Sequence, residues 1–317
     1  MLWNNLVSSE ALRGKSVVVT GCDTGFGFQV SLALTQLGLD VHAGCLTRDG
    51  TRRLAEAHAQ YQECKNGSLT PYIVDVSNDA SFATFANAVS TATNGRLYAA
   101  IANAGIGRDG AIEVLNMDAH RAIFEVNYFG VLRTLRAFAP LLRAQASLQK
   151  SSYKPRFIVI SSISGSMRPT PLLAAYGASK HAASSLGISA RLELEPFGIQ
   201  VTVVEPYFAT TPIVTADRSS AARADFDACT PEVQAAYGEI PLKARSQALS
   251  LLVSNPFTMT PEFVVGKIVK CVQRKHLAHR YPVGFLAYVM LVVQAFIPFW
   301  IIESFMRLGR TGMKKYL

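Results

Sequence analysis

A tyrosine and a lysine lie four residues apart in the sequence Tyr176-Gly-Ala-Ser-Lys180. In a helix this spacing places both side chains on one face, one turn apart. A lysine ammonium beside a phenol favours the phenolate and so lowers the phenol pKa, which is about 10 when unperturbed. We therefore predict that Tyr176 acts as a general acid-base near neutral pH and that Lys180 assists it.

A serine and an asparagine have the chemistry to complete such a site. Ser162 directly follows an apolar run that is typical of a strand, and its hydroxyl can hydrogen-bond a substrate oxygen, with Ser164 as a weaker alternative. Asn127 is a polar residue in a mostly apolar stretch that is predicted to be helical. Its amide either holds a water molecule next to Lys180 or is a core amide that kinks the helix.

A glycine-rich turn occupies positions 20 to 27, with the sequence Thr-Gly-Cys-Asp-Thr-Gly-Phe-Gly. Gly21 permits a tight turn, Gly25 lets the backbone approach a pyrophosphate, and Gly27 lets a helix pack closely on a strand. The helix that begins here offers unpaired N–H groups to an anion. The turn therefore predicts a dinucleotide-binding loop.

The choice of dinucleotide depends on the end of the second predicted strand. There an acidic residue would bind a ribose 2′-hydroxyl and a basic residue would bind a 2′-phosphate. Arg48 and Asp49 offer both, and each is alternatively a solvated loop charge. Asp23 inside the glycine turn would repel a further phosphate, so the sequence favours NAD and leaves NADP open.

Apolar and β-branched runs alternate along the chain with helical stretches such as Phe26 to Leu37, Asp118 to Ala144 and Ala174 to Leu194. The predicted strands are Ser16 to Thr20, Val41 to Leu46, Tyr72 to Val74, Tyr98 to Ala102, Phe157 to Ser161 and Gln200 to Val204. This alternation predicts an α/β fold, a Rossmann-type doubly wound parallel sheet with helices on both faces. Ligands of such sheets bind at the carboxyl ends of the strands, where Ser162 is expected to lie.

Five motifs together resemble the short-chain dehydrogenase/reductase family, from about residue 14 to residue 282. They are the glycine turn, Asp75-Val76, Asn103-Ala104-Gly105, the serine segment and the tyrosine-lysine pair, and they occur in that family's order. The resemblance implies a catalytic tetrad of Asn127, Ser162, Tyr176 and Lys180. It also implies the following cofactor-binding residues: Gly21, Asp23, Thr24, Gly25, Phe26, Gly27, Arg48, Asp75, Val76, Asn103, Ala104, Gly105, Tyr176, Lys180, Pro206 and Thr210.

Three segments narrow the resemblance to one branch of the family. Gly21–Gly27, Ala43–Thr47 and Val204–Pro206 resemble the membrane-associated retinol and hydroxysteroid dehydrogenases and the 3-hydroxybutyrate dehydrogenases, a branch that mostly uses NAD. The chain departs from the family at Ala102, where Asn is usual, and at Tyr207, where Gly is usual. The second departure is consistent with a missing residue. It makes Thr210 the candidate for binding the carboxamide group of the nicotinamide.

The resemblance implies hydride transfer between NAD(H) and an alcohol or its carbonyl product. A lipophilic substrate, like a retinoid or a hydroxysteroid, is preferred because the chain is apolar. The alternative substrate is 3-hydroxybutyrate, whose carboxylate would need a cation such as Lys243, Arg245 or His181. The alternative of another class is a non-catalytic dinucleotide-binding sensor or scaffold.

Composition excludes several other classes of protein. Of the 317 residues, 50% are hydrophobic and 17% are charged, which excludes a disordered or collagen-like chain. The net charge is +9, but no zinc-finger spacing or Lys/Arg-rich block occurs, so we expect no metal site and no nucleic acid partner. Five scattered cysteines favour a reducing compartment and buried thiols. The oligomeric state stays open, with a homo-oligomer as one alternative.

The chain divides into a predicted catalytic domain, residues 1–282, and an apolar tail, residues 283–317. Within the domain, residues 207–260 are predicted to cover the substrate. Val283 to Ile302 carries no charge and is long enough to span a bilayer, to lie in its interface with a kink at Pro298, or to form a buried helix that lines the pocket. Basic residues flank this stretch. We therefore expect contact with a membrane surface through residues 283–302.

The two ends of the chain suggest a location. Residues 1–7 lack the features of a secretory signal, and the last four residues, Lys314-Lys315-Tyr316-Leu317, resemble a dilysine retrieval signal. These features predict the cytosolic face of the endoplasmic reticulum membrane. A mitochondrial membrane and the cytoplasm are the alternatives.

Overall fold

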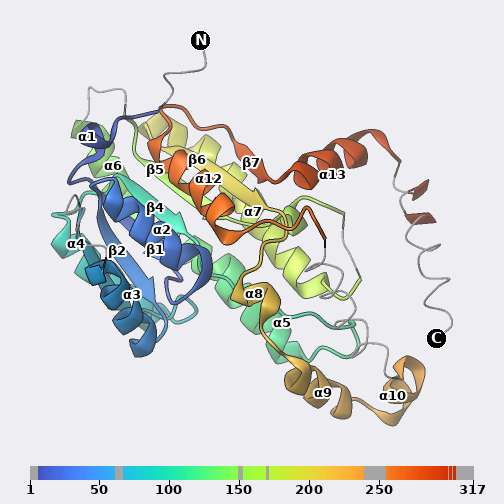
Figure 1. Ribbon diagram of the computed structural model, residues 1–317. Coiled ribbons are helices and arrows are strands. Elements are labelled where there is room, and N and C mark those ends of the chain that lie inside the picture. The colour runs from blue at the N-terminus through green and yellow to red at the C-terminus, as the bar shows by residue number, and fades with distance from the viewer. Residues whose placement is uncertain are drawn as a thin grey trace.

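Short runs of β-branched and apolar residues form the strands of one sheet. The computed structural model describes residues 6–60, 67–148, 153–168, 171–238, 255–298, 300–301 and 303–304. Within these residues the sheet has seven parallel strands in the order β3-β2-β1-β4-β5-β6-β7 (Figure 1). The strands are β1 (Ser16–Thr20), β2 (Asp40–Cys45), β3 (Leu69–Ile73), β4 (Ala99–Ala102), β5 (Arg156–Ile160), β6 (Gln200–Pro206) and β7 (Arg280–Val283). The predicted doubly wound α/β fold is confirmed.

Helices connect the strands and cover both faces of the sheet. The α-helices are α1 (Ser9–Leu12), α2 (Gly25–Gln36), α3 (Arg48–Gln60), α4 (Asp79–Ala92), α5 (Met117–Phe124), α6 (Gly130–Leu148), α7 (Ala174–Leu194), α8 (Pro212–Thr215), α9 (Ser219–Asp227), α10 (Pro231–Tyr237), α12 (Pro261–Gln273) and α13 (Phe285–Phe296). A π-helical turn, η1 (Glu125–Phe129), and two 3₁₀ turns, η2 (Ile163–Gly165) and η3 (Glu195–Phe197), complete the described elements.

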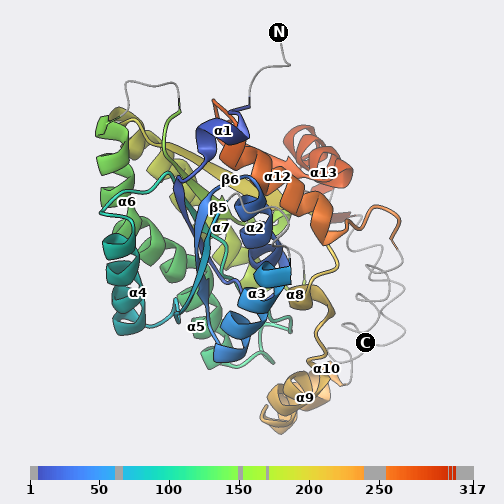
Figure 2. The ribbon, with the colours of Figure 1, turned by 60° about the vertical axis from the view of Figure 1, so that its left-hand side comes forward.

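Successive residues of β1 pack on opposite faces of the sheet. Val17 and Val19 belong to the core beneath α2 and α12, whereas Val18 belongs to the core beneath α4, α6 and α7. Figure 2 shows α4 and α6 on one side of the sheet and α2 and α12 on the other. Because both faces are covered, a central strand consists of consecutive apolar residues instead of alternating with polar ones.

The strand order changes direction between β1 and β4. From β1 the chain proceeds outward to β2 and β3, then returns to β4 and continues to β7 on the other side. The helices that follow β1 and β4 therefore cover opposite faces of the sheet. The loops diverge there, and their divergence opens a crevice at the carboxyl ends of these two strands.

The predicted helix from Asp118 to Ala144 is a helical stretch of three parts. It consists of α5, the π-helical turn η1 and α6, which continues to Leu148. Asn127 lies in the middle of η1. A π-helical turn inserts one extra residue into a helix and is frequent at functional sites.

The last strand, β7, is missing from the sequence prediction. It has the sequence Arg-Tyr-Pro-Val and pairs with the end of β6. Four residues that include a proline give no strand signal of their own, and Pro282 is tolerated because β7 is an edge strand. The boundary predicted after residue 282 thus falls inside a strand, and the apolar tail begins after Val283.

Helix α13 follows β7 and packs against the segments that follow β5 and β6. Ala287 is fully buried against Ile163 and Tyr207, and α13 ends at Phe296, before Pro298. Among the described residues, no helix combines the length and the apolar character needed to cross a membrane.

Three thiols lie in the core beneath α2 and α12. Cys22, Cys45 and Cys271 are at most 1% exposed, and Cys229 is partly buried. Burial raises the pKa of Cys45 and Cys271 to about 12, so both thiols stay protonated and unreactive at neutral pH. The predicted burial of thiols is confirmed for these three, and Cys64 lies outside the described residues.

Candidate active site

The turn between β1 and α2 has a backbone that requires glycine. Gly21 and Gly25 have φ angles of +72° and +62°, in the left-handed region. A Cβ atom on Gly27 would lie 2.2 Å from the carbonyl oxygen of Gly21. Within the described part of the chain, the Thr24 side chain makes no capping hydrogen bond to α2. The first-turn N–H groups of this helix are therefore left for an anion, so the turn fits a dinucleotide phosphate.

The loop after β4 holds the glycine turn in place. The Asn103 amide donates hydrogen bonds to the carbonyl oxygens of Thr20 at 2.9 Å and Gly21 at 3.0 Å. The backbone N–H groups of Asn103 and Ala104 both donate to the Thr20 hydroxyl. A Cβ atom on Gly21 would lie 2.6 Å from the Ala104 Cα atom. The two loops at the crevice therefore form one tightly packed unit.

Asp23 binds the backbone at the end of β2. Its carboxylate accepts hydrogen bonds from the Leu46 N–H at 2.6 Å, the Thr47 N–H at 3.0 Å and the Thr47 hydroxyl at 2.7 Å. Arg48 is exposed at the start of α3, next to this turn. The carboxylate thus places a negative charge where the sequence predicts the adenosine ribose.

Asp75 and Val76 follow β3 at the same edge of the sheet. Asp75 accepts hydrogen bonds from the N–H and the hydroxyl of Ser77, and Val76 is 6% exposed against Gly130. Both residues thus shape the loop that follows β3.

Tyr176 and Lys180 lie one turn apart on α7, as their spacing predicts. The Lys180 Nζ atom is 5.9 Å from the centre of the Tyr176 ring and donates a hydrogen bond to the Ile160 carbonyl at 3.1 Å. The Ser162 hydroxyl accepts a hydrogen bond from the Ser164 N–H at 3.1 Å, and Ser162 lies close enough to Tyr176 to lower the phenol pKa. Ser162, rather than Ser164, is therefore the serine that is paired with Tyr176.

Asn127 lies beside this pair but is fully buried. Its amide oxygen accepts from the Ile106 N–H at 2.8 Å, and its amide nitrogen donates to the Ile106 carbonyl at 2.9 Å and to Ser179 at 3.0 Å. A Cβ atom on Gly105 would lie 3.2 Å from Lys180 Nζ and 3.3 Å from the Asn127 amide oxygen. Asn127 thus ties the loop after β4 to α7, and the predicted water beside Lys180 stays a prediction.

Burial controls the ionisation of the tyrosine and the lysine. It raises the Tyr176 pKa, while the hydrogen bond from Ser162 and the charge of Arg218 lower it to a smaller extent. Burial also lowers the Lys180 pKa to about 8. The expectation that Lys180 leaves Tyr176 with a lowered pKa is therefore wrong for the protein alone. Desolvation of the phenolate outweighs the stabilising charges.

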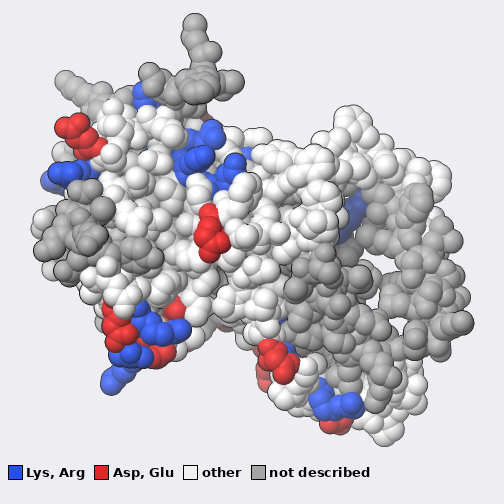
Figure 3. All heavy atoms as spheres, in the orientation of Figure 1, with Lys and Arg blue, Asp and Glu red and all other residues white. Residues whose placement is uncertain are grey.

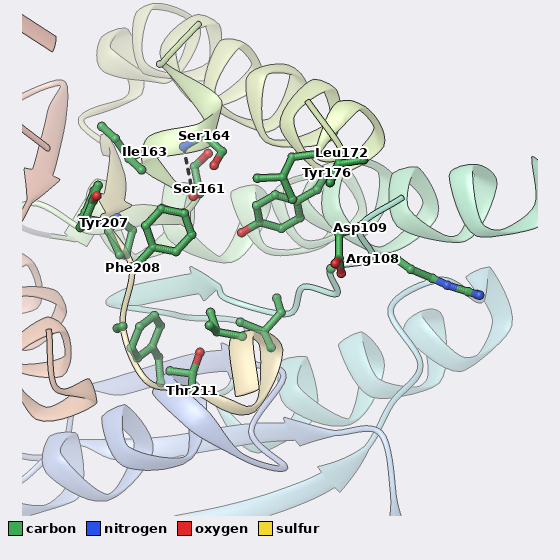
Figure 4. A pocket seen from close by; sticks show the side chains of 18 of the residues that line it. Arg108, Asp109, Ser161, Ile163, Ser164, Leu172, Tyr176, Tyr207, Phe208 and Thr211 are labelled. Atoms are coloured by element: carbon green, nitrogen blue, oxygen red, sulfur yellow. Dashed lines mark hydrogen bonds between the residues drawn. The ribbon is translucent and has the colours of Figure 1, made fainter. Parts of the chain in front are cut away.

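A cavity of about 430 Å³ opens in front of these residues. Figure 4 shows the Tyr176 hydroxyl pointing into it, toward Phe208 and away from Asp109. The lining is mostly apolar and comes mainly from the loops after β4, β5 and β6, with Phe26 from α2 and Tyr176 from α7. The lining residues are Phe26, Gly107, Arg108, Asp109, Ser161, Ser162, Ile163, Ser164, Pro171, Leu172, Leu173, Tyr176, Pro206, Tyr207, Phe208, Ala209, Thr211, Ile213, Val214 and Arg218.

The segment after β6 presents Thr211 to the cavity, not Thr210. Thr210 is exposed and its N–H donates to the Met259 carbonyl, whereas Thr211 is 4% exposed and lines the cavity. Adjacent residues of an extended segment point to opposite sides, so only one threonine can face inward. Thr211-Pro212 is also a helix-start signal, which would have identified Thr211 as the N-cap of α8.

Two arginines at the cavity have carboxylate partners, which sequence reasoning missed. Arg108 bonds the buried Asp225, and Arg218 lies 4.0 Å from Asp109. Each pair joins residues more than a hundred positions apart, so no local pattern reveals it.

Comparison with known proteins agrees with this geometry. The family model for short chain dehydrogenases matches residues 15–222. The mitochondrial D-beta-hydroxybutyrate dehydrogenase of Rattus norvegicus is 32% identical over 73% of this chain, a match that spans 66% of that protein's length. Retinol dehydrogenase 5 of Mus musculus is 27% identical over 91% of this chain and 86% of its own length.

Among solved structures, a short chain dehydrogenase/reductase from Burkholderia phymatum in complex with NAD has the same fold. Its TM-score is 0.71 at 21% identity, and the match covers 92% of this chain and 95% of that one. The family model covers well over half of this chain and includes the glycine turn, Ser162, Tyr176 and Lys180. On this ground the chain belongs to the short chain dehydrogenase family of oxidoreductases.

Proposed function

We propose that this protein is an NAD(H)-dependent oxidoreductase that interconverts a lipophilic alcohol and its carbonyl compound. The observation that carries the proposal is the Tyr176 hydroxyl, which points into an apolar cavity that Ser162 also lines, beside the glycine turn. Bound nicotinamide would supply the hydride acceptor or donor. The relatives named above support the same class of reaction.

Each residue of the tetrad has a role in this reaction. Tyr176 takes the proton of the alcohol during oxidation and returns it during reduction. Ser162 orients the substrate oxygen, and Lys180 contributes positive charge next to the phenol. Asn127 positions the loop after β4 against α7 through its three hydrogen bonds. In this proposal Thr211 takes the place of Thr210 at the nicotinamide end of the site.

The lining of the cavity favours an uncharged, lipophilic substrate. Leu172, Phe208 and Ile213 are among its apolar lining residues, and both lining arginines have a carboxylate partner. A 3-hydroxybutyrate carboxylate would need a cation that is not already paired. His181 does not line the cavity, and Lys243 and Arg245 lie outside the described residues. A retinoid or hydroxysteroid is therefore preferred.

Asp23 favours NAD over NADP. Its carboxylate is held at the end of β2 by three hydrogen bonds and cannot turn away from a nearby ligand without losing them. A 2′-phosphate at this turn would meet that negative charge, whereas a 2′-hydroxyl could donate to it. Arg48 nearby would partly offset the repulsion. NADP is therefore expected to bind more weakly than NAD but still to bind.

The experiment that tests the proposal combines cofactor binding with turnover. We expect purified protein to bind NADH more tightly than NADPH in titration calorimetry, and to oxidise retinol or a hydroxysteroid with NAD. Binding of NADH without turnover of any alcohol or ketone would favour the sensor or scaffold alternative. A kcat/KM for 3-hydroxybutyrate more than about tenfold above that for retinol would favour the hydroxybutyrate alternative.

Ser162→Ala should move the pH dependence of alcohol oxidation to higher pH. Oxidation requires the phenolate of Tyr176, and the Ser162 hydrogen bond lowers the Tyr176 pKa. Loss of this bond raises that pKa further, so kcat/KM against pH should be displaced upward. Ser164→Ala is the matched control and should leave the profile in place. A Ser162→Ala profile displaced to lower pH would contradict the assignment.

We also propose that α13 rests on a membrane surface. Phe285, Tyr288, Val292 and Phe296 lie on one side of the helix and are between 55% and 83% exposed. In Figure 3 the described surface over α13 is mostly free of charged side chains. The opposite side packs with Ile163 and Tyr207, which line the cavity. The helix thus serves as an outer wall of the cavity and offers an apolar face to lipid.

Val292→Asp/Phe296→Asp should weaken vesicle binding at least about tenfold, because burial of each apolar side chain in lipid contributes roughly 1.5–3 kcal/mol. The measurement is cosedimentation with phosphatidylcholine vesicles, with and without anionic lipid. Leu192→Asp is the matched control, since Leu192 is likewise apolar and 69% exposed but belongs to α7 instead of α13. Equal binding of the wild type and the double variant would reject the membrane face, and with it the proposed location on the endoplasmic reticulum.

A further inference from the structure

Two adjacent residues of opposite charge, Arg108 and Asp109, lie in the loop after β4 at the rim of the cavity. Each has a partner of opposite charge in the segment after β6. Arg108 donates to Asp225, which is 7% exposed and also accepts from Asn116 at 2.5 Å. Arg218, which precedes α9, lies 4.0 Å from Asp109. The two ion pairs connect the two sides of the rim.

The two pairs differ in their relation to the reacting groups. Figure 4 shows the Arg108 side chain extending away from Tyr176, and Asp109 lines the cavity together with Tyr176. The Arg218 guanidinium donates to the Ile213 carbonyl at 2.9 Å, and its charge reaches Tyr176 strongly enough to lower the phenol pKa. Arg218 is therefore the cavity-lining arginine whose positive charge acts on the Tyr176 phenol.

Asp109 and Arg218 are both mostly buried, with side chains 22% exposed. At this exposure water screens charges less than at the surface. The charges of Asp109 and Arg218 therefore have a stronger effect on the binding of a charged ligand. We propose that Asp109 is a specificity determinant: by pairing with Arg218 it reserves the cavity for uncharged substrates and excludes substrates that carry a carboxylate.

The physical basis is competition for one guanidinium. A substrate carboxylate that entered the cavity would have to displace Asp109 from Arg218 and would bring a second negative charge next to Asp109. Without the Asp109 charge, the repulsion would be removed and the Arg218 guanidinium could donate hydrogen bonds to a substrate carboxylate. The inference rests on the proposed oxidoreductase function and concerns the charge of its substrate.

The test uses a matched pair of substrates, methyl 3-hydroxyoctanoate and 3-hydroxyoctanoate, which differ in the charge of one group. We expect the wild type to prefer the ester, and Asp109→Asn to shift the ratio of kcat/KM values toward the acid by about tenfold or more. Addition of Arg218→Gln to this variant should abolish the shift. Asp217→Asn is the control, because Asp217 is adjacent to Arg218 but exposed.

A binding measurement separates this inference from the proposed function. Octanoate should bind Asp109→Asn at least about tenfold more tightly than it binds the wild type in calorimetry, whether or not any substrate is turned over. If that occurs without turnover of the ester or of any other alcohol, the role of Asp109 stands and the catalytic proposal fails.

Turnover of the ester with no gain for the acid and no gain in octanoate binding would overturn the role of Asp109 and leave the catalytic proposal intact. Equal gains for the acid in Asp217→Asn would show that the shift follows from the change in net charge alone. That result would also overturn the role of Asp109. Should Asp109→Asn not fold, Asp109→Ser carries the same expectations.

Discussion

Tyr176→Phe should lower kcat for alcohol oxidation by at least about 100-fold, the lower end of what a positioned general acid-base contributes. The substitution removes only the hydroxyl, which points into the cavity that Ser162 also lines. The ring remains, so its packing and its contact with Lys180 are retained. The measurement is NADH formation under saturating cofactor and substrate. The affinity for NADH should change little, because the glycine turn is untouched.

Tyr288→Phe is the matched control for Tyr176→Phe. Tyr288 is 55% exposed on α13 and does not line the cavity, so loss of its hydroxyl should leave kcat unchanged. Full turnover by Tyr176→Phe would show that another group moves the proton. Equal losses in both variants would indicate a general effect of hydroxyl removal and would not support Tyr176 as the acid-base.

Gly27→Ala should destabilise the protein by about 1–3 kcal/mol, the usual cost of overpacking a tight core, and should abolish tight NADH binding. A Cβ atom at this position would lie 2.2 Å from the Gly21 carbonyl oxygen and 2.5 Å from the Asn103 amide nitrogen. Since the nearest atom belongs to the backbone of the turn, the turn itself must move. We expect a lower Tm and a weaker NADH affinity in calorimetry.

Gly266→Ala provides the opposite expectation for the same chemical change. Gly266 lies in the middle of α12, is exposed, and has no atom within 4 Å of a Cβ placed on it. Alanine in a helix interior is favoured over glycine by roughly 1 kcal/mol, so Tm should rise slightly and NADH binding should not change. A Gly27→Ala variant that matched Gly266→Ala in Tm and affinity would contradict the packing described for the glycine turn.

The sequence by itself predicted the parallel α/β fold, the glycine turn and the pairing of Tyr176 with Lys180. These features depend on properties that reside in a few neighbouring residues. Only glycine adopts the backbone of Gly21 and Gly25 at low cost, and a spacing of four in a helix places two side chains together wherever the helix lies. Five of the six predicted strands lie close to the observed ones because buried parallel strands are continuous apolar runs. The third is predicted at Tyr72 to Val74 but β3 begins at Leu69, because this partly exposed strand is not such a run.

Tertiary structure alone decided which side chains face the cavity and how they ionise. Thr211 rather than Thr210 faces inward because the bond from Thr210 to Met259 orients the segment. The Tyr176 pKa is raised because burial by distant elements desolvates the phenolate more than the neighbouring charges stabilise it. The pairing of Asp109 with Arg218 likewise joins two loops. Desolvation and long-range ion pairing depend on chain segments that are distant in sequence, so no local pattern could predict them.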